Sequence, residues 1–181
     1  MMDQITHIMD ISGFGLKNWT YLHKEMAIVE VATGNFIMTE FLLEKDWCEL
    51  TPAEQASVQN DTKFHGIPFR DVGFEEMKQE DIYKVVETFL GNPKNCIVAH
   101  KGNVLVNRVL NKMKIREKFL SDLWCPTYEM LAIDPVCRTN LEVNMPCRLH
   151  SEWQSSRGRL YRCSFNVVCW SRLWLINKCR R

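Results

Sequence analysis

Two cysteines and one histidine near the end of the chain have the residue types and spacing of a metal site. Cys147 and His150 form a Cys-x-x-His pair, so one turn can direct both donors towards one point. Cys163 follows and adds a second sulfur. Thiolate sulfur and imidazole nitrogen are the donors that tetrahedral zinc prefers. The spacing therefore indicates three corners of a zinc site whose fourth ligand comes from elsewhere. The alternative is two core cysteines and a surface histidine.

The charged residues are unevenly distributed along the chain. Residues 1–135 contain 14 Lys or Arg and 20 Asp or Glu, a net charge of −6. Residues 136–181 contain 9 Lys or Arg and 2 Asp or Glu, a net charge of +7. A basic segment is either a solvated face or a surface that holds a phosphate backbone.

Aromatic and basic residues alternate in one part of this basic segment. Its members are Trp153, Arg157, Arg159, Tyr161 and Arg162. Single-stranded nucleic acid is bound by rings that stack on bases, beside cations that contact phosphates. We therefore expect nucleic acid here, with an exposed insertion as the alternative.

Length and composition favour one domain over residues 1–181, with 46% apolar residues for its core. The N-terminus has no basic and apolar signal-peptide regions, and no apolar run approaches the roughly 18 residues of a membrane helix. The eight cysteines are therefore expected in a reducing compartment, as core residues or metal ligands. These features predict a cytoplasmic or nuclear protein without a membrane partner.

The first part of the chain predicts an antiparallel meander. Alternating and branched residues indicate strands over 6–12, 24–31 and 36–43, with a hairpin turn before the third. A helix is expected to begin at Thr51-Pro52, with threonine as the N-cap and proline at the first helical position.

The second part predicts helices around one buried strand. Apolar residues recur at helical spacing over 78–90, 104–113 and 164–177, and a short helix is expected at 125–131. The strand covers 95–99. A strand between two helices is expected to join the meander, so the prediction is an α/β fold with a mixed sheet.

This order of elements resembles the RNase H-like exonucleases of the D-E-D-D type. The resemblance implies an RNase H-like mixed sheet, with a three-strand antiparallel meander plus parallel strands, flanked by helices. In that family carboxylates hold two magnesium ions that activate water for phosphodiester cleavage. Asp10 matches the first carboxylate, but Ser12 and Leu105 stand where two others are expected. The two-magnesium mechanism is therefore not expected, and Asp10 is a degenerate nuclease position that hydrogen-bonds locally.

The chain also resembles the Maelstrom domain, a family of the same fold that has lost these carboxylates. The matching motifs are Glu25-Met-Ala-Ile-Val, His65-Gly-Ile-Pro, the Cys147 and His150 pair, and Cys163 before the last helix. The resemblance implies that Glu25, Cys147, His150 and Cys163 hold a structural zinc ion. His65 is expected to pack near the metal, with exchange for Glu25 as the alternative.

The resemblance further implies a function. We expect a zinc-stabilised domain that binds single-stranded RNA, within small-RNA silencing of the piRNA type and beside silencing proteins. One alternative is a non-catalytic module that binds protein partners on an inherited nuclease fold. Another is a residual ribonuclease that uses His65 and His100 with Asp10.

Overall fold

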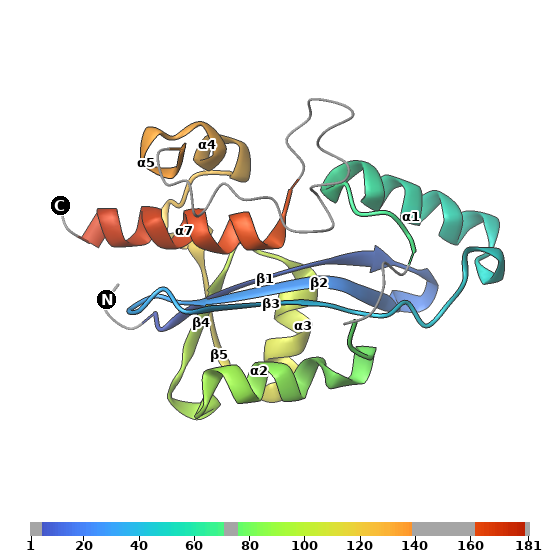
Figure 1. Cartoon of the computed structure of the whole chain (residues 1–181), viewed down its shortest axis with the longest axis horizontal. Helices are drawn as coiled ribbons and strands as arrows, with labels where there is room; N and C mark the ends of the chain where they lie inside the picture. The colour runs from blue at the N-terminus through green and yellow to red at the C-terminus, as the bar shows by residue number, and fades with distance from the viewer. Residues whose placement is uncertain (1–4, 71–75, 139–161, 180–181) are drawn as a thin grey trace.

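The computed structural model describes residues 5–70, 76–138 and 162–179. A five-stranded mixed sheet with the order β3-β2-β1-β4-β5 forms its centre, and helices cover both faces (Figure 1). The predicted α/β fold with a mixed, helix-flanked sheet is thereby confirmed.

The predicted meander forms one half of the sheet. It consists of β1 (His7–Gly15), β2 (Tyr21–Glu30) and β3 (Phe36–Glu40), and each neighbouring pair is antiparallel. The other half consists of β4 (Ile97–His100), parallel to β1, and β5 (Arg116–Phe119), parallel to β4. The strand predicted at 95–99 therefore joins the meander as expected.

The helices form two layers, one on each side of the sheet (Figure 1). On one side lie α2 (Ile82–Leu90) and α3 (Val104–Met113). On the other lie α1 (Pro52–His65), α4 (Tyr128–Ile133), α5 (Pro135–Arg138) and α7 (Ser164–Cys179). Short 3-10 turns occupy Lys17–Trp19, Trp47–Glu49, Gln79–Asp81, Pro93–Asn95 and Leu120–Leu123.

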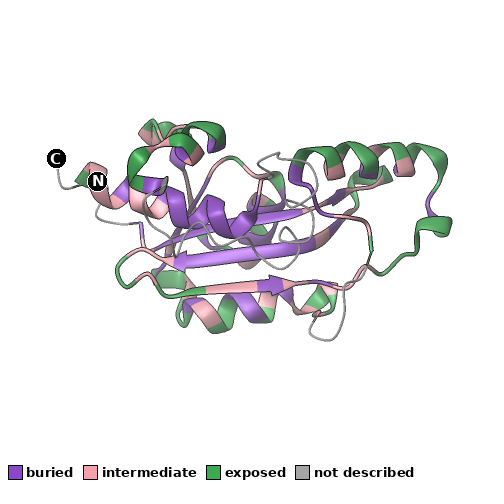
Figure 2. Cartoon of the chain, turned by 45° about the horizontal axis from the view of Figure 1, so that its top comes forward, coloured by how far each residue is buried: buried purple, intermediate pink, exposed green. Residues whose placement is uncertain are grey.

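Each face of the sheet has its own hydrophobic core, and the central strands are buried on both sides (Figure 2). Ile8, Ala27 and Val29 pack towards α7, whereas Met9 and Ile28 pack towards α2 and α3. Burial on both faces explains why these strands are apolar at consecutive positions.

A β-bulge interrupts the pairing of β1 with β2 between Ser12 and Gly13. A Cβ atom at Gly13 would lie 2.1 Å from the backbone oxygen of Leu22, so only glycine fits here. Beyond the bulge β1 continues to Gly15 and carries the chain to the edge where the candidate site lies.

Several boundaries differ from the sequence predictions. The expected strand over 36–43 ends at Glu40, and the helix expected from residue 78 begins at Ile82 after a 3-10 turn. β5 is not predicted, because Arg116, Glu117 and Lys118 show no apolar pattern. It pairs with β4 at the edge of the sheet, where one neighbour supplies the hydrogen bonds and the side chains can stay polar.

Within the described ranges, no helix combines the length and the apolar character needed to cross a membrane.

Candidate functional site

An open cleft of about 710 Å³ lies where β1 and β4 end. The end of β1 contributes Gly13 and Gly15, and the turn from β4 into α3 contributes Lys101, Gly102 and Asn103. Ligands of α/β proteins commonly bind beyond the carboxyl ends of parallel strands, which is where this cleft lies.

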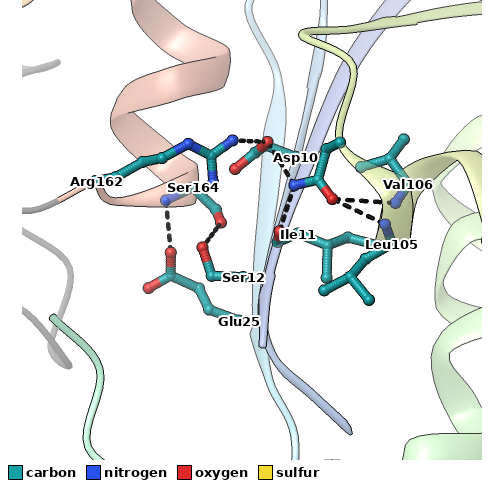
Figure 3. A network of polar contacts seen from close by, with 9 residues as sticks. Asp10, Ile11, Ser12, Glu25, Leu105, Val106, Arg162 and Ser164 are labelled. Carbon is teal, nitrogen blue, oxygen red and sulfur yellow. Dashed lines mark hydrogen bonds and ion pairs between the residues drawn. The ribbon is translucent and has the colours of Figure 1, made fainter. Parts of the chain in front are cut away.

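Asp10 on β1 is completely buried beside the cleft. Its Oδ1 accepts hydrogen bonds from Asn103 Nδ2 at 3.0 Å and from Arg162 Nη2 at 2.5 Å (Figure 3). Asn103 also caps α3, because its Oδ1 accepts the amide hydrogen of Leu105 at 2.9 Å. One carboxylate therefore joins β1, the start of α3 and the residues before α7.

Burial raises the pKa of Asp10, and the Arg162 guanidinium is the largest influence that opposes this rise. The Asn103 amide and the Ser164 hydroxyl also act to lower the pKa. Ser164 makes no well-aligned hydrogen bond to Oδ2, which is buried and has no hydrogen-bond partner among the described residues. Arg162 thus supplies the positive charge that compensates this buried carboxylate.

A second buried carboxylate, Glu25 on β2, faces the start of α7 (Figure 3). Its Oε1 accepts the amide hydrogen of Ser164 at 2.6 Å. The hydroxyls of Ser164 and Ser12 are hydrogen-bonded at 2.9 Å. A carboxylate at a helix N-terminus accepts a hydrogen bond from an otherwise unpaired amide, and its negative charge interacts favourably with the helix dipole. Glu25 and Ser12 therefore attach the first residue of α7 to two strands.

Cys163 is fully buried and directly precedes Ser164. Burial raises the pKa of the Cys169 thiol to about 12, and the nearby Cys163 sulfur adds to this rise. Because Glu25 is bonded to Ser164 and Cys163 precedes Ser164, two of the four implied zinc ligands belong to the same strand–helix junction. Cys147 and His150 lie outside the described residues. Within those residues no group of three or more His, Cys, Asp or Glu is arranged to hold a metal ion.

His65 ends α1 and is buried under the sheet. The Ile67 amide donates to its Nδ1 at 3.1 Å, so Nε2 carries the proton and donates to the Gly13 carbonyl at 3.0 Å. The ring also meets Phe14 edge-on, with centroids 5.2 Å apart. These bonds hold α1 against β1 beside the bulge, and metal binding by His65 would require breaking at least one of them.

The alternative ribonuclease hypothesis uses His65, His100 and Asp10, and each of these residues has a different partner. His100 is buried, and its Nε2 lies 3.2 Å from Glu117 Oε2 on β5. Asn107 of α3 donates to both oxygens of the same Glu117. His100 is thus engaged with β5, while Asp10 contacts Arg162 and His65 contacts Gly13.

Of the residues expected to contact nucleic acid, the structure describes Arg162 alone. Its guanidinium is engaged by Asp10 and lies 5.7 Å from the centre of the Phe64 ring. Trp153, Arg157, Arg159 and Tyr161 lie outside the described residues.

Several residues that line the cleft are not among those predicted from the sequence. They are Tyr21, Phe64, Lys101, Asn103 and Tyr128. Lys101 is held at the cleft by hydrogen bonds to the Pro126 carbonyl and to Cys125 Sγ. Only Asn103 carries a local signal, since asparagine directly before an amphipathic helix indicates an N-cap. The others are brought together by folding.

A scan against protein-family models and a search of curated proteins give no match to this chain.

Proposed function

We propose that the chain is a zinc-stabilised, Maelstrom-like domain that binds single-stranded RNA and does not cleave it by the two-magnesium mechanism. Small-RNA silencing is the setting that the resemblance implies. The proposal depends on two features. One is the set of residues at the positions where the resemblance places nuclease carboxylates, and the other is the cleft beside them.

The observation that carries the proposal is the ion pair between Arg162 and Asp10. Paired magnesium ions need several carboxylate oxygens. Here Asp10 has a guanidinium as its partner, Ser12 is bonded to Ser164, and Leu105 packs in the core. This set of residues favours a site that binds RNA over a site that cleaves RNA with magnesium.

The cleft combines cations with aromatic rings. Lys101 and Arg162 line it together with Tyr21 and Phe64, and the Arg108 guanidinium lies 4.3 Å from the centre of the Tyr21 ring. Phe64 is 65% exposed, so its ring is available to a ligand. Rings that stack on bases beside cations that contact phosphates are typical of proteins that bind single strands.

The implied zinc ion fits the donor chemistry at the junction of β2 and α7. Glu25 accepts the amide hydrogen of Ser164 there, Cys163 directly precedes Ser164, and Cys147 and His150 would complete a four-ligand set. Four protein ligands leave no position for water, so the metal would stabilise the fold rather than activate a nucleophile.

Titration of a labelled single-stranded RNA of about 16 nucleotides tests the proposal. Affinity should fall steeply between about 50 and 200 mM salt, because binding releases counterions. The RNA should stay intact when magnesium is added. Binding that does not respond to salt would contradict the phosphate contacts. Magnesium-dependent trimming that Asp10→Asn abolishes would contradict the non-catalytic assignment.

A further inference from the structure

The segment that contains α3 and β5 is basic, although residues 1–135 as a whole carry a net charge of −6. Residues 101–118 contain six Lys or Arg and one Glu, a net charge of +5. Four of these cations are exposed, and they are Arg108, Lys112, Lys114 and Arg116. Among the residues that the structure describes, no carboxylate forms an ion pair with any of the four. This part of the surface therefore has an excess of positive charge.

The one acidic side chain of the segment, Glu117, is held by its neighbours. Asn107 Nδ2 donates to both carboxylate oxygens, at 3.1 and 3.0 Å, and His100 Nε2 lies 3.2 Å from Oε2. The Glu117 side chain is only 24% exposed. The carboxylate is thus engaged by an amide and an imidazole, and it does not neutralise the exposed cations.

Two of the exposed cations lie over tyrosine rings. The Arg108 guanidinium is 4.3 Å from the centre of the Tyr21 ring, and Lys112 Nζ is 4.3 Å from the centre of the Tyr83 ring. Arg108 and Lys112 are four residues apart, so they are neighbours on one side of α3, about 6 Å apart along the helix axis. Cations beside aromatic rings are typical of surfaces that bind single-stranded nucleic acid. We call Tyr21, Tyr83, Arg108 and Lys112 the α3 surface.

The α3 surface is continuous with the cleft. Tyr21 lines the cleft, and so does Val104, which is 50% exposed and lies one turn before Arg108 on the same side of α3. The helix begins at the cleft and extends away from it. A strand that leaves the cleft over Val104 therefore meets Arg108 first and Lys112 next.

Trp19 lies beside this route, on a turn with an unfavourable backbone conformation. Asn18 and Trp19 have φ values of 55° and 59°, in the left-handed region that is costly for residues other than glycine. Arg108 Nη1 donates to the Trp19 carbonyl at 2.6 Å, which fixes the turn against α3. Trp19 is nevertheless 76% exposed. Burial does not account for this tryptophan, whereas stacking on a base does.

We propose that RNA bound in the cleft continues over the α3 surface, where Arg108 and Lys112 contact its phosphates and Trp19 stacks on a base. This inference rests on the proposed function, which it extends from the cleft to a second surface. The row of positive charges suits the phosphates of a single strand, and the exposed ring suits its unstacked bases.

Titration of a single-stranded RNA of about 16 nucleotides at several salt concentrations tests this route. Arg108→Gln combined with Lys112→Gln should weaken binding and reduce the log–log salt slope by roughly 1.4, because each lost phosphate contact removes roughly 0.7. Lys112→Gln alone leaves the Arg108 contacts in place and should reduce the slope by roughly 0.7. Lys45→Gln combined with Lys94→Gln, two exposed lysines outside the cleft and the α3 surface, is the charge-matched control and should not change the slope.

Trp19→Gly should weaken RNA binding at least about fivefold without changing the salt slope, since stacking releases no counterions. Glycine suits the left-handed backbone, so the melting temperature should not fall. Trp124→Gly is the matched control, because Trp124 is 86% exposed with a left-handed φ of 64° and does not line the cleft. It should leave RNA affinity unchanged.

An unchanged salt slope in the Arg108 and Lys112 variant would overturn the α3 route and leave RNA binding by the cleft intact. An equal loss in the Lys45 and Lys94 variant would also overturn it, since binding would then follow the total charge of the protein. Equal losses in Trp19→Gly and Trp124→Gly would exclude a specific stacking position at Trp19. A wild-type chain that binds no RNA would contradict the proposed function together with this inference.

Discussion

Arg162 and Asp10 form a buried ion pair beside the cleft. Asp10 is fully buried, and its 2.5 Å contact with Arg162 spans 152 positions of sequence. A buried charge that loses its partner is costly, whereas loss of both charges together costs much less. The pair can therefore be tested by a double-mutant cycle.

Arg162→Met should lower the free energy of unfolding by about 3 kcal/mol, because Asp10 is then buried without a counter-charge. Addition of Asp10→Asn should recover part of the loss, since the amide keeps its contact with Asn103 without a charge. Chemical denaturation of the wild type, both single variants and the double variant measures this coupling. Additive effects would show that the two side chains do not interact.

The zinc content of the protein and of its single-residue variants is a second prediction that concerns individual residues. Protein purified without added metal should contain about one zinc ion per chain, and Cys147→Ser or His150→Ala should remove it. Glu25→Gln should reduce the zinc content while the Ser164 amide keeps an acceptor. Cys125→Ser is the control, because Cys125 lines the cleft and is not a proposed ligand. Elemental analysis would refute the zinc proposal if it finds wild type and Cys147→Ser equally free of metal.

The elements that position the site are β1, which pairs with β2 across the bulge at Lys24, and the helices that meet the end of β1. α1 begins at Pro52 with Thr51 as its N-cap, as the sequence predicts, and Thr51 and Glu54 also form a capping box by bonding each other's backbone amides. The same helix ends with Phe64 and His65, which place a ring at the cleft and a bond on Gly13. The register of β1 with β2 sets the position of Gly13, and therefore the position at which the end of α1 is bonded to β1.

Two glycines of β1 allow a matched test of the bulge. Gly13→Ala should destabilise the fold by about 1–3 kcal/mol, because the new Cβ would overlap the Leu22 oxygen. Gly15→Ala, two residues further on, meets its nearest atom at 3.5 Å and should change stability by less than about 0.5 kcal/mol. Thermal or denaturant unfolding compares them. Equal effects would mean that the bulge tolerates a side chain.

At the scale of the whole molecule, charge separates the chain into an acidic and a basic part. The net charge is −6 over residues 1–135 and +7 over residues 136–181. A basic segment of this kind is suited to hold a phosphate backbone, and Arg162, one of its residues, lines the cleft. The salt dependence of the proposed RNA binding tests whether this basic segment contacts the RNA.

Arg157→Ala combined with Arg159→Ala should weaken RNA binding and reduce the log–log salt slope by roughly 0.7 for each lost phosphate contact. Zinc content should not change, since neither residue is a proposed ligand. Arg162 is left in place because it balances Asp10. Lys84→Ala combined with Lys94→Ala, two exposed lysines outside the cleft, is the charge-matched control. An unchanged slope in the Arg157 and Arg159 variant would exclude these residues from the RNA surface.

Local sequence determined most of the elements of this protein. The helix over 104–113 matches α3 at both ends, and α1 begins where its cap and proline predict. Helical periodicity, capping and β-branched runs act over a few residues, so they can be read directly from sequence. The sequence also placed Glu25 on the second strand and Cys163 immediately before the last helix.

Only the tertiary structure decided how distant residues pair. The contact of Arg162 with Asp10, the bond from Ser164 to Glu25, and the buried ion pair of Lys24 with Glu76 each join segments far apart in the sequence. Lys24 lies in a strand whose pattern gives no sign that its charge is buried, and β5 is polar because it is an edge. Such partners meet only after the sheet and helices have packed, so local pattern cannot reveal which charges are compensated or which surfaces remain open.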